Sequence, residues 1–91
     1  MTKVVNIKNS EFDVYIGRGS RWGNPFIIGE HGDREEVIRK YRDYVLSTPE
    51  LMDSLQELNG KRLGCHCAPK PCHGNVLAQL IFEQELLSRM S

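Results

Sequence analysis

The pattern of hydrophobic and polar residues predicts two short strands at the start of the chain. Residues 3–7 and 13–16 are rich in Val, Ile and Tyr, which favour extended backbone, and a polar turn separates them. The chain then enters residues 17–26, where three glycines and one proline are incompatible with a regular element. The second strand is therefore expected to end at this loop.

Helical spacing of apolar residues dominates the middle of the chain. Asp33, with Glu36 three residues later, predicts a capping box at the start of a helix whose apolar positions are 37, 38, 41 and 45. A second helix is expected from Thr48 as N-cap and Pro49 as the first helical residue, and Gly60 closes it.

A third strand and a third helix complete the predicted order β-β-α-α-β-α. Residues 61–67 form the strand, and the helix starts near residues 72–75. The helix carries its apolar side chains on one side: Val76, Leu77, Leu80, Ile81 and Leu87. A strand that returns after helices usually pairs parallel through a right-handed crossover. The expected fold is a small, single-domain, Rossmann-like α/β sandwich over residues 1–91 with a short, mostly parallel sheet.

In sheets of this kind, ligands bind beyond the carboxyl ends of the strands. Two unusual loops, residues 17–26 and 67–74, directly follow predicted strands. If those strands are parallel, both loops lie at one edge of the sheet. The candidate site is therefore expected where these two loops meet.

Composition limits the class of protein. The chain has 91 residues, 40% of them apolar, with 12 basic and 12 acidic side chains, which fits one globular domain and disfavours binding to long nucleic acid. It has no apolar run long enough to span a membrane, and its first residues do not resemble a signal peptide. Three cysteines within eight residues do not make a disulfide framework, so a reducing cytoplasm is the expected location.

Charge is unevenly distributed along the chain. Residues 33–59 carry four basic and seven acidic side chains, whereas the segments on either side have a basic excess. The basic side chains nearest the glycines and prolines are Arg18, Arg21 and Lys70. This distribution favours one local pocket for a small anion.

The first loop has the composition of an anion site. Arginines offer forked donors, a serine offers a hydroxyl, and glycines open the backbone. Trp22 or Tyr15 would pack against a ring of the ligand. The alternative is that Trp22 and Phe26 close the core and the arginines are solvated. The ligand residues predicted here are Gly17, Arg18, Gly19, Ser20, Arg21, Trp22 and Asn24.

The second loop contains every cysteine of the chain and admits several interpretations. In the favoured one, Lys70, His73, Gly74 and the free N–H groups after Cys72 hold an anion at a helix N-terminus. In the second, Cys72 is a nucleophile and His73 or His66 is its base. In the third, zinc is bound by Cys65, Cys67, Cys72 and His73. A loop without any ligand is the remaining alternative, and no cofactor is favoured.

Taken together, these motifs resemble the family called domain of unknown function 4326, which consists of small bacterial and bacteriophage proteins. The resemblance covers almost the whole chain, including Arg34-Glu35-Glu36-Val37. His66 departs from it, since the family usually has an aromatic residue, often Trp, at that position. The motif positions are Gly17, Arg18, Gly23, Asn24, Pro25, Cys65, Cys67, Pro69, Cys72, His73 and Gly74. The resemblance implies a phage or prophage source, and with it a counter-defence or nucleotide-handling role.

The expected function is binding of a nucleotide or another phosphorylated small ligand without turnover, because neither paired carboxylates nor a complete triad is evident. One alternative is an enzyme that acts on a nucleotide or nucleoside through Cys72 or His73. Another is a zinc-stabilised module that binds nucleic acid or protein. Self-association into a homo-oligomer is expected of a domain this small.

Overall fold

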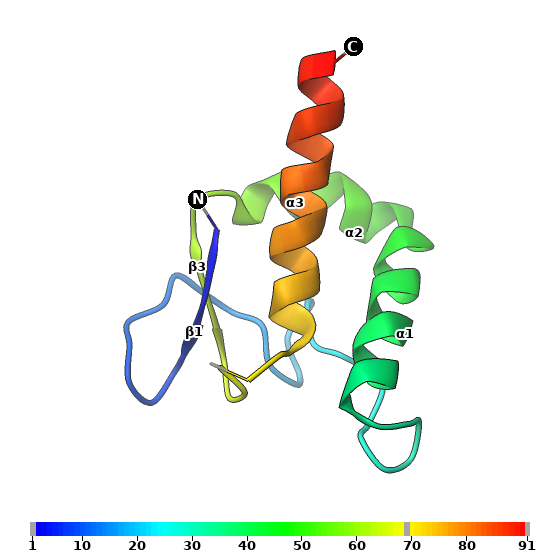
Figure 1. Ribbon diagram of the computed structural model, residues 1–91. Helices are drawn as coiled ribbons and strands as arrows, with labels where there is room; N and C mark the ends of the chain where they lie inside the picture. Colours follow the sequence, from blue (N-terminus) through cyan, green and yellow to red (C-terminus); the bar gives the residue numbers. More distant parts are fainter. Residues whose placement is uncertain (1, 69, 91) are drawn as a thin grey trace.

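Three short strands form one parallel sheet in the computed structural model, which describes residues 2–68 and 70–90 (Figure 1). The strands are β1 (Lys3–Asn6), β2 (Val14–Tyr15) and β3 (Arg62–Cys65), in the order β1-β3-β2. Val4 of β1 and Val14 of β2 both pair with Leu63 of β3. The expected α/β class and the short parallel sheet are confirmed.

Three α-helices and a 3-10 turn make up the rest of the regular structure: α1 (Arg34–Leu46), α2 (Pro49–Ser54), η1 (Leu55–Leu58) and α3 (His73–Met90). The capping box of α1 is confirmed, because the Asp33 side chain accepts a 2.9 Å hydrogen bond from the Glu36 N–H. Thr48 is the N-cap of α2 and Pro49 its first residue, as predicted, but the Thr48 side chain makes no capping hydrogen bond. Its hydroxyl instead donates to the Tyr44 carbonyl at 2.6 Å, which ties α2 back to the end of α1.

The core lies between the sheet and the helices. Figure 1 shows α3 between the sheet and α1, and α3 contacts both. The first turn of α3 rests directly on the sheet, because a Cβ at Gly74 would lie 2.8 Å from Ile16 and 3.0 Å from Val4. Only glycine permits this close approach. The largest fully buried side chains are Tyr41, Ile16, Leu55, Leu58, Leu63, Leu77, Ile81, Val45 and Cys65.

The end of β3 and the exposure of Leu87 differ from what the sequence predicts. β3 ends at Cys65 rather than at residue 67, so His66 and Cys67 belong to the following loop. Leu87 is 68% exposed rather than buried, because the last turns of α3 project beyond the other elements (Figure 1). Within residues 2–68 and 70–90, none of the helices is long and apolar enough to cross a membrane.

Candidate functional site

A cavity of about 400 Å³ opens where β2 and β3 end. Its walls come from the loop that follows β2, the loop that follows β3 and the first turns of α1. Both strand pairs are parallel, so the two loops lie at the same edge of the sheet, as the sequence predicts. The cavity falls within the usual size range of small-molecule sites.

One wall of the cavity is positively charged. Arg18 lines it and is exposed, and none of the described residues forms a hydrogen bond or ion pair with its guanidinium. Arg34, the first residue of α1, also lines it and donates to the Pro71 carbonyl at 3.0 Å. The described lining residues include neither Asp nor Glu. The arginines therefore attract an anion into a cavity whose described lining includes no carboxylate.

Part of the lining is apolar and is formed by Phe26, Ile27, Ile28, Val37 and Ile38. Asn24 sets the start of this apolar wall, because its side-chain oxygen accepts a 2.9 Å hydrogen bond from the Phe26 N–H. The Phe26 ring in turn packs edge-on against His31 and Tyr44. A ligand in this cavity thus meets both guanidinium groups and hydrocarbon.

Tyr15 lies at the end of β2 and lines the cavity. Its ring occupies the space that a side chain at position 17 would need, since a Cβ on Gly17 would overlap the phenol. The hydroxyl lies 3.4 Å from the His66 Nε2. Gly17 therefore allows the Tyr15 ring to lie beside the first loop.

His73 is the first residue of α3 and is only 8% exposed, yet it lines the cavity. Its Nε2 donates a 2.6 Å hydrogen bond to the Ile16 carbonyl, and its ring packs edge-on against Tyr41 with centroids 5.0 Å apart. Burial lowers the pKa of His73, and the hydrogen bond to Ile16 opposes that effect only in part. The imidazole is therefore neutral at neutral pH.

Two of the three cysteines are buried. Cys65 and Cys72 are buried free thiols with their sulfur atoms 3.4 Å apart, and Cys67 is half-buried. Burial, together with the contact to Cys65, raises the pKa of the Cys72 thiol to about 12. Cys72 is thus protonated at neutral pH, which gives no support to its predicted role as a nucleophile.

The zinc hypothesis finds no support in the arrangement of these side chains. Zinc would require Cys65, Cys67, Cys72 and His73 to converge on one point as deprotonated ligands. Nowhere in residues 2–68 and 70–90 do three or more His, Cys, Asp or Glu side chains come together in a way that could hold a metal ion. His73 also directs one ring nitrogen at a backbone carbonyl.

Comparison with known protein families finds a match for this chain. The family model of a domain of unknown function, DUF4326, matches residues 2–83. The chain belongs to the DUF4326 family. The resemblance found from the motifs is therefore confirmed. Seven of its eleven motif positions line the cavity: Gly17, Arg18, Asn24, Cys65, Cys67, Cys72 and His73. Pro69, another of them, lies outside the described residues.

Viral proteins are among the relatives of this DUF4326 chain. It is 40% identical over 85 residues to an uncharacterised 12.4 kDa protein in the nrdA-td intergenic region of Enterobacteria phage T4, a match that covers 89% of this chain and 78% of that protein. It is 38% identical over 86 residues to the uncharacterised protein R718 of Acanthamoeba polyphaga mimivirus, covering 75% of this chain and 65% of that protein. No solved structure matches.

Several predicted ligand residues lie away from the cavity of this DUF4326 chain. Trp22 is 5% exposed and belongs to the core, so it cannot stack on a ligand here, and the alternative that it closes the core is confirmed. The Arg21 side chain lies outside the cavity and contacts Ser54 and Glu57. The Ser20 hydroxyl donates to the Gly17 carbonyl at 2.6 Å, which closes the turn.

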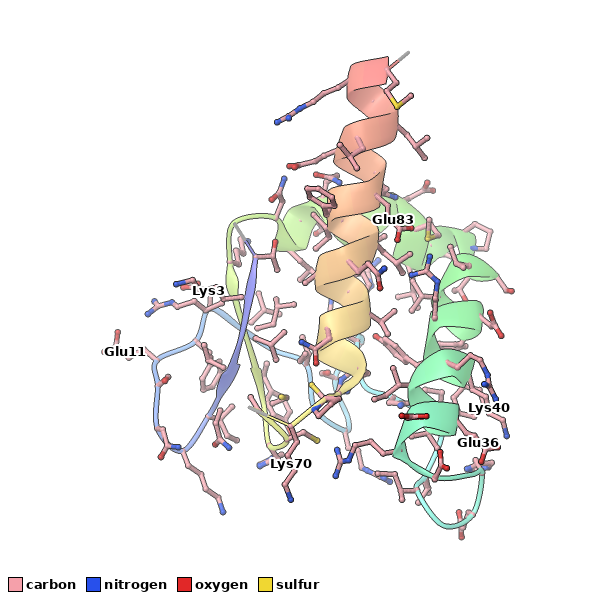
Figure 2. All side chains as sticks on the ribbon, viewed as in Figure 1. Lys3, Glu11, Glu36, Lys40, Lys70 and Glu83 are labelled. Carbon is pink, nitrogen blue, oxygen red and sulfur yellow. The ribbon has the colours of Figure 1, made fainter. Side chains whose placement is uncertain are left out.

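The helix N-terminus contributes less than the sequence predicts. Neither Lys70 nor Gly74 lines the cavity. Figure 2 shows the Lys70 side chain at the end of the molecule near the start of α3, directed away from the body. The Gly74 N–H is hydrogen-bonded to Cys72 and lies in a buried turn. Gly19 sits in the exposed turn of the first loop, with a φ of 86°, and is also outside the cavity.

Sequence reasoning missed Arg34 and most of the apolar wall. Arg34 directly follows the Asp33 cap, so its place in the first turn of α1 was predictable. That this turn would face Pro71 depends on how α1 packs across the sheet, which local sequence does not encode. The only available signal was the presence of Arg34 within the family resemblance.

Proposed function

We propose that this protein binds a nucleotide or another phosphorylated small molecule in the cavity at the ends of β2 and β3, in the manner of a Rossmann-like domain. The observation that carries the proposal is the lining of that cavity. The lining combines Arg18 and Arg34 with five apolar side chains, and the described lining includes no carboxylate.

The arginines of the lining suit the phosphate of such a ligand, and the apolar residues suit its ring. Guanidinium groups bind phosphate through paired, charge-assisted hydrogen bonds. Arg34 is already held by the Pro71 carbonyl and Arg18 has its donors free, so one is fixed and one can adjust. The apolar wall around Phe26 and Ile38 would cover a flat ring. A cavity of about 400 Å³ favours a small ligand over a polymer.

Binding is favoured over catalysis by the chemistry of the lining. An enzyme that used Cys72 as nucleophile would need its thiolate, and the raised pKa of Cys72 opposes that form. Viral proteins are among the relatives of this chain, and the proposal includes a setting in the cytoplasm of an infected host cell, with a role in nucleotide handling or counter-defence. Self-association into a homo-oligomer stays part of this proposal.

Isothermal titration calorimetry against nucleoside mono-, di- and triphosphates, free nucleosides and inorganic phosphate tests the proposal. At least one nucleotide should bind, and Arg18→Gln should weaken it by about 10- to 100-fold, as expected for one charged hydrogen-bonding group. Arg89→Gln, near the end of α3 and outside the cavity, is the matched control and should bind like the wild type. If the folded protein binds none of these compounds, the proposal is wrong.

A further inference from the structure

The two ring nitrogens of His73 have different surroundings. Nε2 lies 2.6 Å from the Ile16 carbonyl oxygen, which can only accept a hydrogen bond. Nε2 must therefore carry the hydrogen. In the neutral ring, Nδ1 then has a free lone pair. Within residues 2–68 and 70–90, the hydrogen bonds of the His73 ring include one at Nε2 and none at this Nδ1.

Several other polar side chains around the cavity are donors or are already engaged. Arg18 and Arg34 can only donate. The Asn24 oxygen accepts from the Phe26 N–H, and the Tyr41 hydroxyl, packed against the His73 ring, donates to the Trp22 carbonyl at 2.7 Å. Cys72 adjoins His73 in the chain, and its sulfur contacts that of Cys65. A nine-tenths buried imidazole thus keeps one strong acceptor free in a cavity rich in donors.

We propose that His73 Nδ1 accepts a hydrogen bond from a hydroxyl or N–H group of the ligand whose phosphate contacts Arg18 and Arg34. This inference rests on the proposed function and narrows its ligand class. Inorganic phosphate satisfies the arginines alone. A nucleotide offers both a phosphate and a donor, either on its ribose or on its base, and it contacts the apolar residues as well.

The protonation state of His73 fits this role. Burial lowers its pKa, so Nδ1 is unprotonated and able to accept at neutral pH. Protonation would turn Nδ1 into a donor and would place a third cation beside the two arginines. His66 is the other titratable group of the lining besides the tyrosine and the cysteines, and its Nε2 faces the Tyr15 hydroxyl across the loop.

Nitrogen-15 NMR of the imidazole groups tests the tautomer and the contact separately. In the free protein at pH 7.5, His73 should show a protonated Nε2 and an unprotonated Nδ1. Addition of AMP, GMP, CMP or UMP, whichever binds most tightly, should move the Nδ1 resonance upfield, as a new hydrogen bond requires. Inorganic phosphate should leave the Nδ1 resonance in place.

Calorimetry of His73→Gln provides the second measurement, because the glutamine amide can still donate to the Ile16 carbonyl while Nδ1 is lost. Affinity for that nucleotide should fall about 10-fold at pH 7.5 and affinity for inorganic phosphate should not change, with Arg89→Gln, outside the cavity, as the control. A His73 ring protonated on Nδ1 overturns the inference on its own. The inference is also wrong if a nucleotide binds tightly while the Nδ1 resonance stays in place and His73→Gln binds as tightly as the wild type. That result leaves the proposed function intact. Failure of every nucleotide to bind overturns both.

Discussion

Burial controls the protonation of Cys72 and His73. Cys72 is 3% exposed, and its high pKa follows from the cost of placing a thiolate among apolar groups. His73 shares that environment but has a carbonyl partner for one ring nitrogen, so it stays neutral with a defined tautomer. At the residue scale, the histidine keeps a free polar atom at the cavity and the thiols do not.

The three thiols should differ in reactivity. Because Cys67 is half-buried and Cys65 and Cys72 are buried, one thiol per chain should react with iodoacetamide at neutral pH before the other two, which should require unfolding. Mass spectrometry of the labelled peptides identifies the site. A Cys67→Ser variant is the control and should lose the early label. Early labelling at Cys72 would contradict the argument from burial.

Stability should depend on pH through His73. Its folded-state pKa lies below the ordinary value of 6.5, so the unfolded chain binds more protons in that range and acid favours unfolding. The contribution is fully present above about pH 6.5 and is lost as the pH falls below that value. Urea unfolding between pH 5 and 8 should show this decline. The decline should be smaller in His73→Gln, and an equal decline in both proteins would assign it to other groups.

Acid sensitivity has a second source at lower pH. The hydrogen bonds from Arg62 hold the pKa of Asp13 below its ordinary value of 3.8. That contribution to stability is present above pH 3.8 and is lost only as the pH falls further. Because the pKa of Asp13 lies below 3.8, Asp13 stays ionised between pH 5 and 8, and the decline in that range can be read without interference from Asp13.

Residue types and spacing in the sequence were enough to nominate Arg18, Asn24 and His73, because each lies in a loop that directly follows a strand. They were not enough to separate Trp22 from Tyr15. Both are aromatic and both adjoin the glycines, but the Trp22 ring turns into the core and the Tyr15 ring turns to the cavity. The direction of each ring depends on the packing of α1, since Tyr41 holds the Trp22 carbonyl.

At the scale of the elements, the position of α1 against α3 shapes the cavity, because α1 supplies one of its walls. An ion pair joins the two helices, with Arg42 on α1 and Glu83 on α3 at 2.9 Å, and both side chains are about one-third exposed. Glu83 is labelled in Figure 2 and extends from α3 on the side of α1. The other guanidinium nitrogen of Arg42, Nη1, is buried without a hydrogen-bond partner.

Removal of Glu83 should therefore cost more than removal of an exposed partner. Glu83→Ala leaves a half-buried guanidinium unpaired and should lower the free energy of unfolding by about 1–2 kcal/mol. Glu57→Ala breaks the exposed, 3.7 Å pair with Arg21 and should cost about 0–0.5 kcal/mol. Urea denaturation of both variants measures the difference. Equal costs would mean that the Arg42–Glu83 pair does not hold the helices together.

Periodicity predicted the elements better than it predicted their ends. The capping box of α1 is local chemistry, so the sequence alone located it. The end of β3 at Cys65 and the exposure of Leu87 depend instead on where neighbouring elements stop. β2 gives the sheet only two residues of pairing, and α3 continues past the last element that could cover Leu87. These limits are set by tertiary contacts and not by local pattern.

At the scale of the whole molecule, the cavity lies at the edge of the hydrophobic core and shares residues with it. The sheet, the first turn of α3 and the first turn of α1 all contribute to both, so the cavity exists only when the chain is folded. A compound that binds there must therefore stabilise the folded state by mass action. The small size of the domain makes this effect large in temperature, because the entropy of unfolding scales with chain length.

A bound nucleotide should raise the melting temperature by an amount that grows with the logarithm of its affinity. At a concentration 100 times the dissociation constant, the folded state gains about 2.7 kcal/mol, or about 10–20 °C for a domain of this length. If Arg18→Gln weakens binding 10-fold, the same concentration gives about 1.4 kcal/mol, so its shift should be about half that of the wild type. Arg89→Gln should shift like the wild type. Differential scanning fluorimetry measures all three, and a full wild-type shift in Arg18→Gln would show that Arg18 does not contact the ligand.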